Sequence, residues 1–267
     1  IRFVRHETNA GLLATANQLL ELAQGEYIYC AAADDKVLPG FFEKSMQCLS
    51  NHPRAALCCS DPAYFNNLGR VESRAFRLSR QPTHLSPKAM AAVIRKENFI
   101  VGGHTTIVRL EAFREAGGLI KDLKWHCDWF ALHVMAFRYG ACYIPEFLAS
   151  MRSMDRSYSK SGMRDPKEQQ QVIENILDLL RQDRYRDVQS QFADSGILSV
   201  FGTKALQIVF SDSRFSRFRT LRFLWNTFKR EIKGVIAKMT PKITKRIYRK
   251  WRDSSHPFSL TRKCYGH

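Results

Sequence analysis

Apolar and polar positions alternate along the first 150 residues in short blocks that predict strands and helices in turn. Residues 26–33 are an apolar run that follows Gly25 and ends at charge, as is typical of a buried strand. Residues 12–22 repeat leucine at helical spacing, and Gly25 is the stop signal. Pro39 suits the first turn of another helix, whose apolar face would consist of Phe41, Phe42, Met46 and Leu49.

The same alternation continues to residue 148. Residues 55–59 predict a second buried strand, and residues 66–69 predict the turn of a hairpin. Ser86 and Pro87 have the N-cap and first-turn chemistry of a helix that ends near Lys96. Strands that alternate with helices predict an α/β domain rather than a helical bundle.

The chain changes character after its first 152 residues. Residues 153–165 are polar and contain serine and glycine, so they predict a loop, which is either a lid over a ligand or an ordinary linker. Asp165 and Pro166 then start a helix, and the pattern is helical from there on. We therefore expect a domain over residues 1–152, a connecting loop, and a helical extension over residues 166–267.

Residues 213–252 combine apolar side chains at steps of three and four with basic residues between them, which predicts a basic amphipathic helix. No stretch of the sequence reaches the roughly 18 uninterrupted apolar residues of a membrane span. Two interpretations remain: the apolar stripe lies at the interface of an anionic membrane, or it packs on the preceding domain. The stripe consists of Phe218, Leu221, Trp225, Phe228, Ile232, Val235 and Met239.

Charge separates the extension from the domain. Of the 267 residues 45% are hydrophobic, which is enough for a sizeable core. The formal net charge is +17, and residues 201–267 contain 17 Lys and Arg against 3 Asp and Glu. This basic segment favours polyanions, whether anionic lipid, nucleic acid or a phosphorylated acceptor. Because its aromatic residues have helical spacing and the sequence shows no known nucleic-acid motif, we favour an anionic membrane surface.

Seven cysteines lie mostly within apolar stretches and lack the spacing of a zinc site. They predict reduced, buried thiols in a cytoplasmic protein. Together with the basic extension, they predict peripheral attachment at the cytoplasmic face of the membrane.

Asp34 and Asp35 stand between the first predicted strand and the helix that follows Pro39. In open α/β sheets, ligands bind in the crevice beyond the carboxyl ends of the strands. Two adjacent carboxylates at that place can hold a hard divalent cation against a diphosphate. The alternative is that Asp35 or Lys36 merely begins the helix.

Several groups of residues recur in a fixed order along the first 165 residues. In the first half they are Asn9, Gly11, Asn17, residues 25–28, Asp34 with Asp35, and Pro39. In the second half they are residues 103–109, 113–119, 125–132 and 143–148, followed by Arg152. This order resembles family 2 glycosyltransferases, which have the GT-A fold. The resemblance implies an α/β protein with a GT-A-like, Rossmann-related mixed sheet flanked by helices, to which the basic helical extension is added.

The resemblance also implies an enzyme, namely an inverting glycosyltransferase that moves a sugar from a nucleotide-diphosphate sugar to a hydroxyl of a glycan or lipid-linked acceptor. Asp35 would bind Mg²⁺ or Mn²⁺, Asp34 would contact both the metal and the donor, and Asp128 would be the catalytic base. Further candidates are Asn9, Gly11 and Arg152 for the donor, and His104 and Trp125 for the acceptor.

Each role has a structural alternative. Asp128 could instead be an N-cap residue. Trp125 could simply fill the core, and His104 could lie in a buried turn. Arg152 could be solvated, and Asn9 with Gly11 could form a turn before a helix. A second class of function is a catalytically inactive binding module whose basic extension attaches to membrane or nucleic acid.

Two features depart from the family pattern. Ala32 occupies a position where the family's acidic motif often has a further Asp, a loss that is compatible with Asp35 as the metal ligand. Residues 1–5 resemble the second strand of the fold. We therefore expect an N-terminally truncated domain without the family's first strand and helix.

Overall fold

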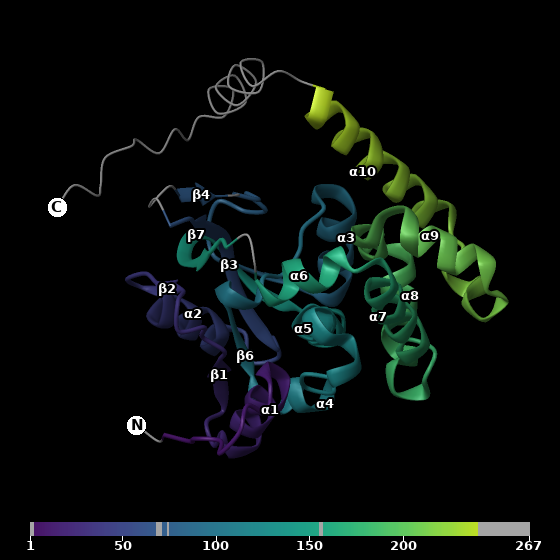
Figure 1. The fold of residues 1–267 in the computed structure, drawn as a ribbon. Helices are drawn as coiled ribbons and strands as arrows, with labels where there is room; N and C mark the ends of the chain where they lie inside the picture. The colour runs from purple at the N-terminus through teal and green to yellow at the C-terminus, as the bar shows by residue number, and fades with distance from the viewer. Residues whose placement is uncertain (1–2, 68–70, 74, 155–156, 240–267) are drawn as a thin grey trace.

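The computed structural model describes residues 3–67, 71–73, 75–154 and 157–239, which form a mixed sheet covered by helices (Figure 1). Its strands cross the sheet in the order β1-β6-β3-β7-β2, with β4 paired to β3 and β5 to β7. β3 and β7 run parallel, and the other described pairs run antiparallel. This mixed α/β architecture confirms the predicted fold class. The strands are β1 (Tyr27–Tyr29), β2 (Lys36–Val37), β3 (Leu57–Phe65), β4 (Val71–Ser73), β5 (Thr83–Leu85), β6 (Thr106–Arg109) and β7 (Ala141–Arg152).

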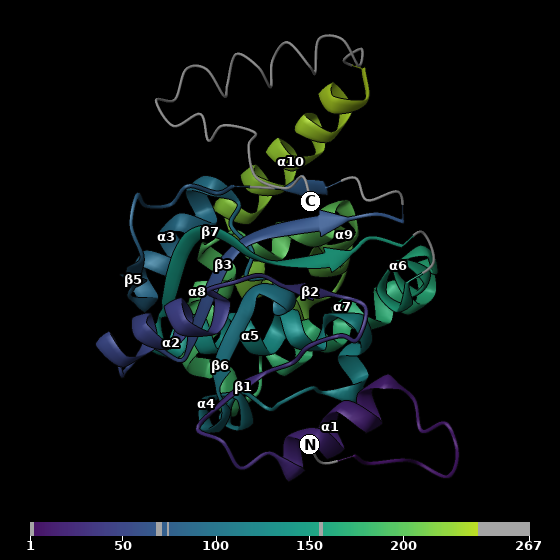
Figure 2. The same cartoon turned by 90° about the vertical axis from the view of Figure 1, so that its left-hand side faces the viewer.

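Helices lie on both faces of this sheet (Figure 2). Side chains alternate along β3: Leu57 and Cys59 enter a large core shared with α5, while Cys58 enters a smaller core beneath α2. The helices of this part are α1 (Leu12–Leu22), α2 (Phe41–Asn51), α3 (Pro87–Glu97), α4 (Leu110–Glu115) and α5 (Cys127–Tyr139), with the short 3₁₀ turns η1 (Gly103–Thr105) and η2 (Lys121–His126).

The helical extension packs on α5 and continues the large core. Phe192 of the extension lies 5.8 Å from Phe130 and 5.1 Å from Phe137 of α5, measured between ring centroids. The large core runs from β3 to Phe223, so the change near residue 152 is one of secondary structure and not the start of a separate core. The extension comprises α6 (Tyr158–Arg164), α7 (Pro166–Leu179), η3 (Asp183–Tyr185), α8 (Arg186–Asp194), η4 (Ile197–Phe201), α9 (Gly202–Ser211), η5 (Ser213–Phe218) and α10 (Leu221–Met239).

The predicted start of α2 is wrong by two residues. Gly40, with a φ of 84°, precedes the helix, so Pro39 lies outside its first turn. The left-handed conformation of Gly40 turns the chain out of the β2 connection, where the Leu38 N–H bonds to the sheet at Leu148. Exposure also differs from the predicted face: Phe41 and Leu49 are buried, whereas Phe42 and Met46 are 48% and 37% exposed. Ser45 and Cys48 complete the buried face instead.

Other local predictions have mixed outcomes. The hairpin is confirmed by the pairing of Phe65 with Val71, and the Ser86 cap by its 3.3 Å bond from the Ala89 N–H. The expected loop over residues 153–165 is wrong in its second half, because the Ser157 side chain accepts from the N–H of Lys160 and caps helix α6. The expected buried strand after Gly25 is shorter, over β1 only, and half-buried at the sheet edge.

The start of the chain does not form the expected strand. Phe3 to Arg5 have no sheet partner, and Phe3 is 83% exposed. A strand needs a hydrogen-bonded neighbour, and the described sheet offers these residues none. Residues 1–2 lie outside the described part of the chain.

Candidate active site

The acidic loop, residues 30–35, leaves β1 and is held against the end of β7. Lys36 pairs with Ser150, so the two-residue strand β2 brings the loop beside Arg152. The backbone N–H of Arg152 donates to Oδ1 of Asp35 over 2.9 Å, and its Nε donates to the carbonyl of Asp34 over 3.4 Å. The structure therefore brings together three residues that the sequence predicted as one donor site.

Charge around the two carboxylates is incompletely balanced. Burial raises the pKa of the Asp35 carboxyl; the N–H bond from Arg152 opposes this shift, and the neighbouring charge of Asp34 adds to it. Two cations, Lys36 and Arg152, lie 4.6 Å and 5.4 Å from the centroid of the Phe65 ring. The charge of Arg152 lowers the pKa of Asp35, and an additional cation beside the carboxylates would lower it further.

Asp128 is the second residue of α5, and its two carboxylate oxygens have different surroundings. Oδ1 accepts the N–H of Trp129 over 2.7 Å, which fixes the carboxylate at the helix N-terminus. A Cβ built on Gly103 would lie 2.8 Å from Oδ2, so this second oxygen faces the backbone of η1. The N-cap residue of α5 is His126, and therefore the predicted alternative of Asp128 as the N-cap is wrong.

Asp128 is exposed to solvent, but its Oδ2 lies against the backbone of η1 and loses part of its hydration there. This partial desolvation raises its pKa, and the N–H bond from Trp129 opposes the shift. A carboxylate in this setting becomes a stronger base than one in bulk water, because its conjugate acid releases the proton less readily.

The start of the acidic loop joins the surroundings of Asp128 to those of Asp35. Although Cys30 is exposed, partial loss of hydration raises the pKa of its thiol, and the charge of Asp128 raises it further. The Tyr29 hydroxyl donates to the carbonyl of His104 over 3.0 Å, and the pKa of Tyr29 is raised by burial and then by the charge of Asp35. Residues 29–35 thus run between the surroundings of the two candidate carboxylate centres.

Residues 1–117 match the model of glycosyl transferase family 2. This segment of the chain is therefore similar to that family. A curated relative, the uncharacterized protein MT1568 of Mycobacterium tuberculosis (strain CDC 1551 / Oshkosh), is 30% identical over 161 residues. The match covers 57% of this chain and 50% of the relative, so the chain spans about half of that protein's length.

Solved structures of S. aureus TarS, residues 1–349, are also similar to this chain. The structure in complex with UDP-GlcNAc has a TM-score of 0.48 at 14% identity and covers 80% of this chain and 58% of TarS 1–349. A second structure of TarS 1–349 has a TM-score of 0.48 at 16% identity and covers 83% of this chain and 59% of TarS 1–349.

The two acceptor candidates, His104 and Trp125, are largely enclosed by the protein. Burial lowers the pKa of His104 to about 4, and its Nε2 is buried with no hydrogen-bond partner in the described structure. Trp125 is only 9% exposed, and its indole N–H donates to Oε1 of Gln169 over 2.8 Å. Gly162 of α6 lies against the Trp125 ring, where a Cβ would come within 2.0 Å. The structure therefore shows Trp125 packed in the large core, which is the alternative that the sequence left open.

Asn9 and Gly11 lie at the start of α1. Oδ1 of Asn9 accepts the N–H of Gly11 over 2.9 Å, and the carbonyl of Gly11 accepts the N–H of Thr15. Their described hydrogen bonds remain within this turn and do not reach the acidic loop. The turn before a helix, which the sequence left as an alternative, accounts for both residues in the structure.

A metal at the acidic loop would have to use few protein ligands. No group of three or more His, Cys, Asp or Glu side chains among the described residues could hold a metal ion. The loop offers Oδ2 of Asp35 and the carboxylate of Asp34, to which no described hydrogen bond leads. Mg²⁺ is commonly bound by one or two carboxylates together with substrate phosphates, and this pair fits that pattern.

Sequence reasoning missed three residues of the site: Tyr29, Cys30 and Gly103. Cys30 is also the exception to the expected buried thiols, because it is exposed while the other described cysteines are buried. The only sequence signal for Gly103 is the Gly102-Gly103 pair before His104, which permits close approach of another group. The part of the chain described here contains no helix long and apolar enough to cross a membrane.

Proposed function

We propose that this chain carries the site of an inverting glycosyltransferase, which transfers a sugar from a nucleotide-diphosphate sugar to a hydroxyl of a glycan or lipid-linked acceptor. The observation that carries this proposal is the position of residues 29–35, which contact Arg152 at one end and, through Tyr29, the η1 turn that faces Asp128 at the other. This position supports the proposal, because a direct displacement requires a diphosphate-binding group and a general base near the same substrate.

The donor would bind at the acidic loop. Asp34 and Asp35 would hold Mg²⁺ or Mn²⁺ together with the diphosphate, and this ion would supply Lewis-acid stabilisation of the departing phosphate oxygens. The Arg152 guanidinium is fixed beside the loop by its own Nε bond to Asp34 and adds positive charge on the same side. Both contributions grow as the bond to the leaving group breaks, which is the condition for accelerating the reaction.

Asp128 would act on the acceptor. Its Oδ2 takes the proton from the acceptor hydroxyl while the hydroxyl oxygen attacks the anomeric carbon, and the bond from that carbon to the diphosphate oxygen breaks. The Trp129 N–H holds Oδ1, so the carboxylate keeps its orientation during proton transfer. One displacement of this kind inverts the anomeric carbon, and a positioned base contributes about 10²–10⁴-fold to the rate.

Calorimetric titration of the chain with a panel of nucleotide-diphosphate sugars, with and without Mg²⁺ or Mn²⁺, tests the donor half of the proposal. Asp35→Asn should abolish the metal-dependent part of donor binding, whereas Asp122→Asn, an exposed acid on η2, should leave it unchanged. Equal metal dependence in wild type and Asp35→Asn would remove Asp35 from this role. Tight donor binding without transfer to any offered acceptor would instead favour the inactive binding module.

A further inference from the structure

Helix α10 is seated on the body of the protein by one of its faces. Phe223 and Thr227 are fully buried, and Asn226 is 8% exposed. A Cβ on Gly196 would lie 1.7 Å from Nδ2 of Asn226, and the helix therefore approaches the backbone of the extension closely there. These contacts fix which side of α10 faces outward.

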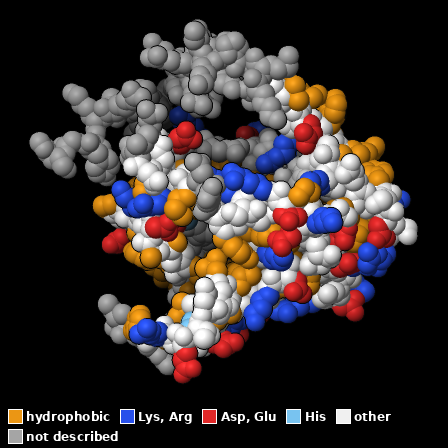
Figure 3. Space-filling model, in the orientation of Figure 1, with side chains coloured by type: hydrophobic (Ala, Val, Ile, Leu, Met, Phe, Trp, Pro, Cys, Tyr) orange, Lys and Arg blue, Asp and Glu red, His pale blue; other side chains and the backbone are white. Residues whose placement is uncertain are grey.

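The outward face of α10 is apolar. It corresponds to most of the predicted stripe and lies at the edge of the molecule in Figure 3, where hydrophobic side chains gather along α10. Single exposed apolar residues are ordinary, but a continuous row of this length marks an interaction surface. The row, called the α10 stripe here, consists of Leu221 (86% exposed), Trp225 (56%), Phe228 (56%), Ile232 (40%), Val235 (53%) and Ile236 (57%).

Basic residues border the α10 stripe. Arg222 and Lys229 are seven positions apart, which places them along one edge of the helix. Nζ of Lys229 lies 5.1 Å from the centroid of the Trp225 ring. Glu231, the acid within α10, faces the body instead, where a Cβ on Gly202 would lie 2.8 Å from its Oε1.

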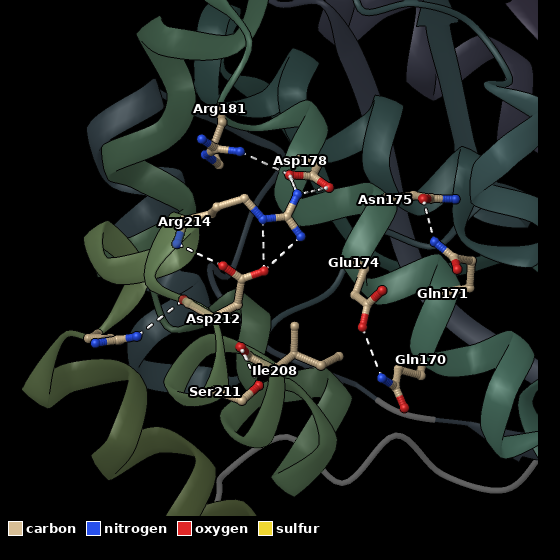
Figure 4. A network of polar contacts seen from close by, with 11 residues as sticks. Gln170, Gln171, Glu174, Asn175, Asp178, Arg181, Ile208, Ser211, Asp212 and Arg214 are labelled. Atoms are coloured by element: carbon tan, nitrogen blue, oxygen red, sulfur yellow. Dashed lines mark hydrogen bonds and ion pairs between the residues drawn. The ribbon is translucent and has the colours of Figure 1, made fainter.

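Other cations of the extension are already neutralised within the fold. Arg214 of η5 forms ion pairs with Asp212 at 2.7 Å and with Asp178 at 3.3 Å, and Arg181 also reaches Asp178 (Figure 4). These contacts tie η5 to α7 below the start of α10. At the border of the stripe, Arg222 also donates to the carbonyl of Asp194 over 3.3 Å, whereas Lys229 lies over the Trp225 ring.

From this two-sided arrangement we infer that α10 docks in the headgroup region of an anionic bilayer, with the α10 stripe toward the acyl chains. Trp and Phe on the apolar side with Lys and Arg at the edge suit that interface. A symmetric contact with a second copy would bring two basic edges together, and single-stranded nucleic acid would leave the aliphatic part of the stripe in water. The inference does not depend on the proposed glycosyl transfer.

Vesicle flotation of the full chain tests the inference. The stripe variant Phe228→Glu/Ile232→Glu is compared with Leu12→Glu/Leu19→Glu, which removes two exposed apolar side chains from α1 and adds the same charge (Figure 1). Vesicles of phosphatidylcholine with phosphatidylserine should bind wild type and the α1 variant equally, and the stripe variant roughly tenfold or more weakly. Pure phosphatidylcholine or high salt should weaken wild-type binding.

Fluorescence supplies a second readout. In a Trp251→Phe background three indoles remain: Trp225, which is exposed, and Trp125 and Trp129, which are buried. Anionic vesicles should therefore shift the emission of Trp225 to shorter wavelength. Equal flotation of the stripe variant and wild type would overturn the inference. So would a wild-type dimer that the stripe variant abolishes without any vesicle binding, or salt-dependent RNA binding in place of vesicle binding.

Discussion

The backbone N–H of Arg152 donates to Oδ1 of Asp35 over 2.9 Å, across 117 positions of sequence. The donor is the main chain of Arg152, so the guanidinium takes no part in this hydrogen bond. Any residue except proline at position 152 would keep the N–H, so the position of the acidic loop and the charge beside it can be separated by mutation.

Arg152→Ala should therefore keep the acidic loop in place while removing positive charge from the proposed diphosphate site. We expect the KM for the nucleotide-diphosphate sugar to rise about tenfold, as for the loss of one charge-assisted contact. Arg152→Lys should recover part of the loss, because it restores the charge without the planar fork. Steady-state kinetics check this expectation, with Arg164→Ala on α6 as the control. An unchanged KM for Arg152→Ala would mean that the Arg152 side chain is solvated and does not bind the donor.

Asp128→Asn should leave donor affinity nearly intact and lower kcat by about 10²–10⁴-fold, because the amide cannot accept the proton. Asn can still accept the Trp129 N–H through its carbonyl oxygen, so the start of α5 should be preserved. Retained turnover would exclude Asp128 as the base. In wild type, kcat should fall as the pH drops through the raised pKa of Asp128, at a higher pH than for an ordinary carboxyl.

The same substitution has a consequence for stability. The pKa of Asp128 is higher in the folded state than in the unfolded state, so the folded protein binds this proton more tightly. The protonated carboxyl therefore favours folding at low pH, and this contribution is lost as the pH rises through the folded-state pKa. Asp128→Asn should consequently raise Tm at pH 7, and the gain should vanish below about pH 3.9. Thermal melts of both proteins across this range check the sign; a lower Tm for the variant at pH 7 would contradict it.

The sequence was sufficient to locate the acidic pair after a strand, because Gly25 and the apolar run over residues 26–33 mark that strand, although β1 itself ends at Tyr29. It could not place Arg152 beside that pair. The contact depends on β2, whose two residues Lys36 and Val37 are exposed and show no apolar alternation. Likewise, the approach of Gly103 to Asp128 depends on the pairing of distant segments.

The amphipathic segment shows a different limit of sequence reasoning. Periodicity identified the apolar stripe but not the direction in which it points. In the structure the buried face of α10 consists of Phe223, Asn226 and Thr227. Gly196 and Gly202 of the extension have no side chain, so α10 can approach their backbone closely. The predicted helix is also interrupted: η5 ends before α10 begins, and residues 240–252 of the prediction lie outside the described part of the chain.

Gly103→Ala provides the most local test of the base. Gly103 has no left-handed backbone, so alanine is tolerated by its conformation, but its Cβ would come within 2.8 Å of Oδ2 of Asp128. The carboxylate or the η1 turn must shift, and this displaces the oxygen that would take the proton. We expect kcat to fall about tenfold or more, since small misplacements of a catalytic group are costly.

Gly102→Ala is the matched control for this displacement. A Cβ there would meet the His104 ring at 3.4 Å, an ordinary contact, and would leave Asp128 untouched. Kinetics and thermal melts of both variants separate a catalytic effect from a folding defect, because only the Gly103 variant should lose kcat out of proportion to Tm. Equal kcat values in the two variants would mean that Oδ2 of Asp128 does not take the proton.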